Sequence, residues 1–89
     1  METYKIKCSN SVSRDWYKVE EDLPDAMERC KKFLQTSPSD RLKSGGRLKK
    51  LKGKQNGILQ YDIDDSHRVW YVVDKKERIV EIKYIGTHP

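Results

Sequence analysis

The chain has 89 residues, of which 35% are hydrophobic and 37% are charged, and its formal net charge at pH 7 is +5. This length excludes two independent domains, so we expect one small domain with a thin core over residues 1–89. The first residues lack the apolar stretch of a signal peptide, and no apolar run approaches the ~20 residues that cross a bilayer. We therefore expect a cytoplasmic protein.

The two cysteines, Cys8 and Cys30, lie far apart in the sequence. Secreted domains of this size usually carry more cysteines as disulfide staples, so we expect two reduced, buried thiols. Together with His67 and His88 the cysteines show no zinc-site spacing. We therefore expect neither a metal ion nor a cofactor.

An amino-terminal strand is predicted over Tyr4–Cys8, where apolar residues alternate with lysines. The segment Ser9–Ser13 then offers helix N-cap residues. Trp16, Val19 and Leu23 follow at helical spacing. The sequence therefore predicts that a helix follows the first strand.

Pro24 interrupts this helical pattern, so either one helix kinks there or a second helix begins. From Asp25 the apolar spacing resumes and lasts until Thr36. These apolar residues are predicted to face the core: Ala26, Met27, Cys30, Phe33 and Leu34.

The segment Ser39–Gly57 is polar, basic and interrupted by glycines, which predicts a surface loop without structure of its own. Between Arg41 and Lys54 it holds seven cationic residues and no acidic one. Such a run is either a solvated loop or a surface that binds an anionic polymer such as nucleic acid, and charge alone leaves both open.

Three strands are predicted in the remainder, over Ile58–Asp64, Arg68–Asp74 and Arg78–Gly86. In the last of them Val80, Ile82 and Tyr84 are expected on one face. The order of elements predicts an α+β fold. One amino-terminal strand and one or two helices precede a three-stranded antiparallel meander, and the helices pack on one face of a four-stranded sheet.

If Asp74–Glu77 forms the last turn, Arg68 opposes Lys83 and projects away from the helices beside Trp70. A sheet face that combines cations with an aromatic ring is typical of surfaces that contact RNA. The alternative is structural: if Asp64 opposes Arg68, a cross-strand ion pair explains the arginine without any chemistry.

Three stretches of the second half carry a family resemblance: RLKKLKGK (47–54), HRVWYVVD (67–74) and IKYIGTH (82–88). In this order and spacing they resemble the RelE/ParE superfamily of toxins from bacterial and archaeal type II toxin–antitoxin systems. The resemblance implies a small sheet with helices on one face and a cognate antitoxin protein that wraps the toxin. It also implies two branches: RelE-like toxins cleave mRNA, usually in the ribosomal A site, and ParE-like toxins inhibit DNA gyrase.

In the nuclease branch the resemblance assigns catalysis to Arg68, at the start of its strand, and to His88, just after the last strand. The resemblance implies that lysines of the basic segment bind the RNA backbone, and the candidates are Lys49, Lys50, Lys52 and Lys54. We expect Arg47 and Lys83 to bind RNA as well. Three aromatic residues are candidates for stacking on a base: Tyr61, Trp70 and Tyr84. His67 is expected to cap a turn or to contact solvent.

These residues predict a ribosome-dependent mRNA endonuclease that uses the RNA 2′-OH as nucleophile without a metal ion. His88 titrates near neutrality and would act as acid or base, while Arg68 would hold phosphate oxygens in a bidentate manner. Two departures leave a weaker or inactive site open: the chain stops at Pro89, without the carboxy-terminal tail of many members, and Tyr61 stands where some nucleases have lysine or glutamate. The alternatives are a ParE-like gyrase inhibitor and a non-catalytic RNA-binding or antitoxin-binding relic.

Overall fold

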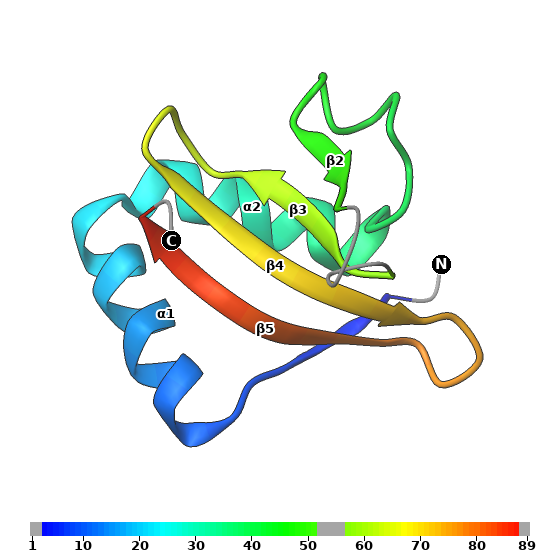
Figure 1. Cartoon of the computed structure of the whole chain (residues 1–89), viewed down its shortest axis with the longest axis horizontal. Helices are drawn as coiled ribbons and strands as arrows, with labels where there is room; N and C mark the ends of the chain where they lie inside the picture. The colour runs from blue at the N-terminus through cyan, green and yellow to red at the C-terminus, as the bar shows by residue number, and fades with distance from the viewer. Residues whose placement is uncertain (1–2, 52–56, 88–89) are drawn as a thin grey trace.

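The computed structural model describes residues 3–51 and 57–87. Two helices and a five-stranded sheet make up this part of the chain. In order they are β1 (Lys5–Lys7), α1 (Asn10–Asp22), α2 (Pro24–Thr36), β2 (Leu48–Lys50), β3 (Leu59–Asp62), β4 (His67–Asp74) and β5 (Ile79–Thr87) (Figure 1).

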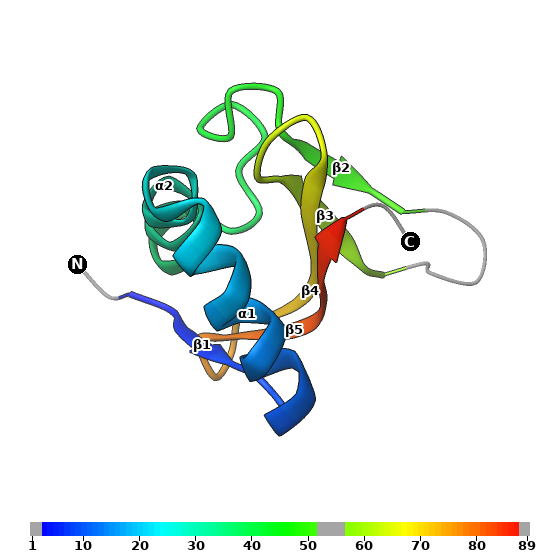
Figure 2. The same ribbon diagram turned by 90° about the vertical axis from the view of Figure 1, so that its left-hand side faces the viewer.

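The strands are arranged in the order β1-β5-β4-β3-β2, with β1 parallel to β5 and all other pairs antiparallel. Both helices lie on one side of this sheet, as Figure 2 shows, so in the described part of the chain the other side carries no helix. The predicted α+β class and the one-sided helical layer are confirmed. The predicted strand number is wrong, because Leu48–Lys50 in the supposed loop pairs with β3 as a fifth strand.

The boundary between the helices follows directly from local chemistry. The Ser9 side chain caps α1 by accepting a hydrogen bond from the Val12 N–H at 3.4 Å. Leu23 separates the helices, and Pro24 occupies the start of α2. Proline has no backbone N–H, but at this position of a helix an N–H would have no intrahelical acceptor. Of the two alternatives at Pro24, the structure shows a second helix.

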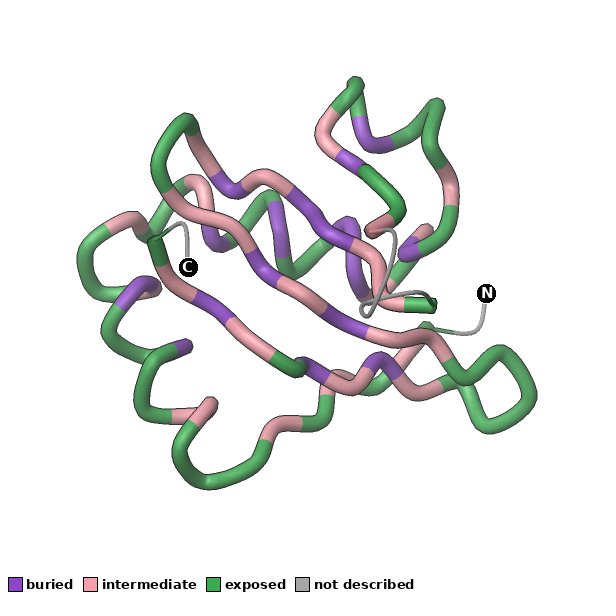
Figure 3. The backbone as a smooth tube through the Cα atoms, viewed as in Figure 1, coloured by how far each residue is buried: buried purple, intermediate pink, exposed green. Residues whose placement is uncertain are grey.

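The core lies between the helices and the covered side of the sheet. Along β4 buried and partly exposed residues alternate (Figure 3), with Val69 and Tyr71 fully buried. Most predicted helical core residues are buried, including Met27, Cys30 and Leu34 at 0% exposure. In the described residues no helix has the length and apolarity required to span a membrane.

The predicted register of the last hairpin is wrong. Asp74 pairs with Ile79, so the last turn lies one residue later than predicted, and Arg78 closes it with a φ of 58°. A β-bulge between Trp70 and Tyr71 shifts the register again. As a result Arg68 opposes Gly86 and not Lys83.

The bulge also moves Tyr84. It pairs with Trp70 on the side of the sheet away from the helices, not with the buried Val80 and Ile82 as predicted. At the first turn β3 ends earlier than predicted, so Asp62 opposes Arg68 in place of Asp64. The expectation that Arg68 projects away from the helices survives these shifts, because its neighbour Val69 points into the core.

Stability is expected to fall at alkaline pH because of Cys30. Burial raises the pKa of its thiol to about 12, although the nearby Arg29 lowers it in part. A thiol whose pKa is higher in the folded than in the unfolded chain stabilises the fold below the unfolded value of about 8.5, and this contribution is lost as the pH rises toward 12. Melting temperatures measured from pH 7 to 11 should therefore fall less steeply for Cys30→Ala than for the wild type. Parallel curves would contradict this assignment.

Candidate functional site

The side of the sheet without helices, here called the open face, carries a chain of polar contacts across three strands. The Trp70 indole donates to Gln60 Oε1 at 3.0 Å, and Gln60 Nε2 donates to Asp62 Oδ1 at 2.9 Å. Lys49 Nζ lies 3.3 Å from the other oxygen of Asp62. Gln60 is buried by these neighbours at 5% exposure. The contacts fix the orientation of the Trp70 ring and of the Asp62 carboxylate.

Arg68 lies next to these contacts but forms none of them. It is opposite Asp62 in the register, yet that carboxylate is engaged by Lys49 and Gln60. The Nε of Arg68 is buried and has no hydrogen-bond partner within residues 3–51 and 57–87. No ion pair joins Arg68 to an acidic group among the described residues, so the structural explanation of this arginine is not supported. A buried donor without an acceptor is uncommon in folded proteins and calls for an explanation.

An aromatic pair lies beside Arg68. The rings of Trp70 and Tyr84 are 5.5 Å apart between centroids and tilted by 54°. The Tyr84 hydroxyl donates to the Thr87 carbonyl, so the ring folds back over Gly86. Since Gly86 is the cross-strand partner of Arg68, the missing side chain at this position leaves the space that Tyr84 occupies.

Gly86→Ala is expected to disturb this arrangement and to destabilise the fold by about 1–2 kcal/mol. Gly86 has a φ of 150°, and an added Cβ would lie 3.1 Å from the Tyr84 hydroxyl. Urea denaturation measures the stability, and near-ultraviolet circular dichroism reports the Trp70–Tyr84 pair. Gly46→Ala is the control, because Gly46 also has a positive φ, 85°, but no atom within 4 Å of an added Cβ. Equal spectra for both variants would contradict the role of Gly86.

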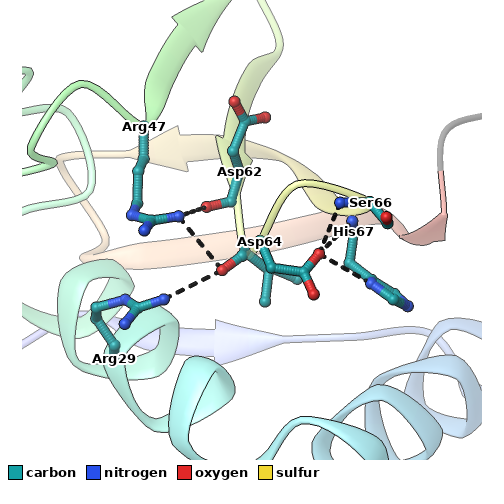
Figure 4. Close-up of polar contacts among 7 residues, drawn as sticks. Arg29, Arg47, Asp62, Asp64, Ser66 and His67 are labelled. Carbon is teal, nitrogen blue, oxygen red and sulfur yellow. Dashed lines mark hydrogen bonds and ion pairs between the residues drawn. The ribbon is translucent and has the colours of Figure 1, made fainter.

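The turn before Arg68 is closed by the Asp64 carboxylate. Its Oδ1 accepts hydrogen bonds from the backbone N–H of Ser66 at 2.8 Å and of His67 at 2.6 Å, and lies 3.0 Å from His67 Nδ1 (Figure 4). Burial by itself raises the pKa of the Asp64 carboxyl, but the hydrogen bonds from Ser66 and His67 together lower it below its ordinary value. The contact between His67 and Asp64 agrees with the expected role of His67 in a turn.

Two arginines hold the same turn from outside. Arg47 Nη1 donates to the Asp62 carbonyl at 3.1 Å, and Arg29 Nη2 donates to the Ile63 carbonyl at 3.2 Å (Figure 4). The predicted RNA-binding residue Arg47 therefore has its guanidinium on the protein backbone.

The remaining predicted residues divide by position. Lys49, Trp70 and Tyr84 lie on the open face with Arg68. Lys50 is exposed and borders a depression at the opposite end of the sheet, next to Lys75. Lys83 Nζ is 2.6 Å from Glu81 Oε1, which is the main reason that the pKa of Glu81 is lowered. Lys52, Lys54 and His88 lie outside the described residues.

Tyr61 belongs to the core and not to the open face. It is 2% exposed, and its ring stacks on Phe33 of α2 with centroids 4.8 Å apart. A ring buried in this way cannot stack on a base, so the candidate role for Tyr61 is wrong. The residues of β3 that share the open face with Arg68 are Gln60 and Asp62, and the sequence interpretation assigned them no function. Their alternation with Tyr61 in ILQYDID was the available signal.

No cluster of three or more His, Cys, Asp or Glu side chains able to bind a metal occurs in the described part of the chain. The open face instead combines the Arg68 guanidinium, which makes no ion pair with a described residue, with a carboxylate, a lysine and two aromatic rings. This combination can bind a phosphodiester and contact a flat base at the same time.

No family model matches the sequence, and no curated protein matches it significantly. Solved structures do match over almost the whole chain. YafQ from E. coli is 13% identical with a TM-score of 0.70, and the match covers 96% of this chain and 93% of that one. The YoeB/ParE toxin from Agrobacterium tumefaciens is 19% identical with a TM-score of 0.69, covering 96% and 99%.

A third match is the toxin–antitoxin complex RelBE2 from Mycobacterium tuberculosis, which is 19% identical with a TM-score of 0.64 and coverage of 99% and 94%. The chain therefore has the fold of RelE/ParE-like toxins. The resemblance predicted from the sequence is confirmed at the level of the fold.

Proposed function

We propose that this protein is the toxin of a type II toxin–antitoxin system and that it inhibits translation by cleaving mRNA on the ribosome. The proposal rests on one observation about Arg68. Its buried Nε has no acceptor among the described residues, and the side chain lies beside Trp70 and Lys49 on the open face. Arg68 as a whole is partly exposed, so its guanidinium would turn toward a phosphate of bound RNA, which would supply the missing acceptor. The toxin fold and the basic segment before β3 support the same interpretation.

The proposed reaction is transesterification. The RNA 2′-oxygen attacks the adjacent phosphorus while the bond from phosphorus to the 5′-oxygen breaks, which leaves a 2′,3′-cyclic phosphate and a 5′-hydroxyl. One group must take the proton of the 2′-OH and another must protonate the leaving 5′-oxygen. Arg68 stabilises the negative charge on the phosphorane, and this role needs no proton transfer because its guanidinium stays charged.

Two side chains are proposed for the proton transfers. Asp62 is the carboxylate nearest to Arg68 in the strand register, and the contacts of Gln60 and Lys49 orient it. His88 remains the sequence candidate for the second proton transfer, and it lies outside the described residues. Trp70 and Tyr84 are proposed to contact a base next to the cleaved bond, and Lys49 to contact the backbone. The proposal includes a cytoplasmic location and an antitoxin that covers the open face.

The test is cleavage of an mRNA on programmed bacterial ribosomes in the presence of EDTA, with end-group analysis of the fragments. Cleavage in the A-site codon with a 2′,3′-cyclic phosphate supports the proposal. Inhibition of DNA gyrase supercoiling without RNA cleavage would overturn it in favour of a ParE-like inhibitor. RNA binding without cleavage, on or off the ribosome, would overturn it in favour of a non-catalytic relic.

A further inference from the structure

We propose that Arg29 and Arg47 form an arginine clamp on the end of β3, and that both are positioning residues that hold Arg68 in place for catalysis. This inference rests on the proposed function for its catalytic part. It also reassigns Arg47, which was predicted from the sequence to contact RNA.

The clamp binds two consecutive backbone carbonyls. Arg47 Nη1 lies 3.1 Å from the Asp62 oxygen and 3.5 Å from the Ile63 oxygen, and Arg29 Nη2 lies 3.2 Å from the same Ile63 oxygen. The backbone donors nearest in register are used elsewhere: the Arg47 N–H donates to the Ser44 carbonyl at 3.3 Å, and the His67 N–H donates to Asp64 Oδ1 at 2.6 Å. The two guanidinium groups replace the missing donors at this end of the sheet.

The clamped residues lead directly to the open face. Asp62 is both the residue whose carbonyl is held and the cross-strand partner of Arg68. The Asp62 N–H also donates to the Arg47 carbonyl at 3.0 Å, so Arg47 holds this residue through its side chain and its backbone. Any displacement of Asp62 would move its carboxylate relative to Arg68.

The turn itself is held by hydrogen bonds from two sides. Inside, Asp64 accepts hydrogen bonds from Ser66 and His67, and outside, the clamp holds Ile63, whose side chain is fully buried. Arg29 belongs to α2, between the buried Met27 and Cys30. The clamp therefore ties the helical layer to the turn that precedes Arg68 (Figure 4).

A role in RNA contact fits the geometry of the clamp less well. Burial raises the pKa of the Tyr61 hydroxyl, and Arg29 and Arg47 lower it in part, so both guanidinium groups lie near this core tyrosine. Tyr61 points to the helical side of the sheet, whereas Arg68 belongs to the open face. The clamp therefore acts from the side opposite to the proposed RNA site.

The experiment compares Arg29→Met, Arg47→Met and the double variant with Arg14→Met. Arg14 is an exposed arginine of α1, so the control removes one charge without touching the turn. Three quantities are measured: the single-turnover cleavage rate on programmed ribosomes at saturating protein, the salt dependence of RNA binding, and the hydrogen-exchange rates of the Ser66 and His67 amides.

We expect each single variant to lower the single-turnover rate about 10-fold, because small misplacements of catalytic groups are costly. In the double variant the single-turnover rate should fall by more than the product of the two single-variant factors, because the Ile63 carbonyl then loses both donors. The salt slope of RNA binding should equal that of Arg14→Met. A slope lowered by about 0.7 relative to that control, with the maximal rate intact, would identify Arg47 as an RNA contact and overturn the proposal.

Arg29→Lys and Arg47→Lys keep the charge and replace the methionine variants in the experiment if those unfold. A lysine side chain is one bond shorter than that of arginine, so its ammonium does not reach the two carbonyls that Arg47 Nη1 contacts, and Arg47→Lys should keep the salt slope of the wild type but not its rate. Full recovery of the rate by lysine would show that only charge matters and would contradict the clamp.

The exchange rates separate failure of the clamp from failure of the proposed function. If the wild type cleaves no RNA, the proposed function fails, and the clamp still predicts at least 10-fold faster exchange of the Ser66 and His67 amides in the double variant. Exchange equal to that of Arg14→Met would overturn the clamp whatever the activity.

Discussion

Replacing Arg68 with methionine is expected to lower the single-turnover rate of mRNA cleavage about 100- to 1,000-fold, the usual loss when one donor to a developing negative charge is removed. The reason is the position of Arg68 on the open face, opposite Asp62 in the strand register, where its buried Nε has no hydrogen-bond partner among the described residues. Cleavage is measured on programmed ribosomes at saturating protein, so that weaker binding does not mask the effect.

The stability of Arg68→Met should equal or exceed that of the wild type. A buried Nε without an acceptor costs free energy in the folded state, and methionine removes this donor while it retains an unbranched apolar chain. Loss of activity together with retained or increased stability distinguishes a functional arginine from a structural one. Activity equal to the wild type, or unfolding of the variant, would contradict the site.

Arg68→Lys and Arg14→Met complete the experiment. Lysine keeps the charge but cannot bind two phosphate oxygens through a planar fork, so we expect only partial recovery of the rate. Arg14→Met removes a charge from an exposed position of α1 and should leave the rate unchanged.

Tyr61→Ala is expected to destabilise the protein by about 3–5 kcal/mol, the usual cost of removing a large buried aromatic side chain. Tyr61 is 2% exposed and stacks on Phe33 across the interface between β3 and α2. This loss is a large fraction of the total stability of a small domain. Urea denaturation at neutral pH measures it.

The matched comparison is with Trp70, which lies on the open face beside Tyr84. Trp70→Ala should weaken RNA binding by about 1–3 kcal/mol, the usual contribution of one stacked base. Tyr61→Phe keeps the buried ring and should bind RNA as tightly as the wild type. If Tyr61→Phe lost RNA affinity, the assignment of Tyr61 to the core alone would be wrong.

The sequence predicted the fold class because hydrophobic periodicity records which face of each element is buried. The stripe that contains Met27, Cys30 and Leu34 and the alternation around Val69 in β4 both face the core. Pro24 also indicated a break between helices, although its chemistry left a kink equally open. The fold implied by the family resemblance agreed with these patterns, and the solved structures confirm that fold.

The sequence did not predict which residues meet on the open face. Register depends on where each turn closes and where a bulge adds a residue, and neither leaves a clear mark in the periodicity. The bulge beside Trp70 places Tyr84 on the open face and Gly86 opposite Arg68. The Asp64 turn places Asp62 opposite the same arginine.

By itself, then, the sequence determined the buried face of most elements, the outward direction of Arg68 and the family whose fold the chain shares. These depend on local alternation and composition. Only the tertiary structure decided that β2 joins the sheet, that Tyr61 belongs to the core, and that Arg29 and Arg47 converge on the end of β3. Each of these contacts joins residues distant in sequence, and their geometry is set by strand register and helix packing, which periodicity does not encode.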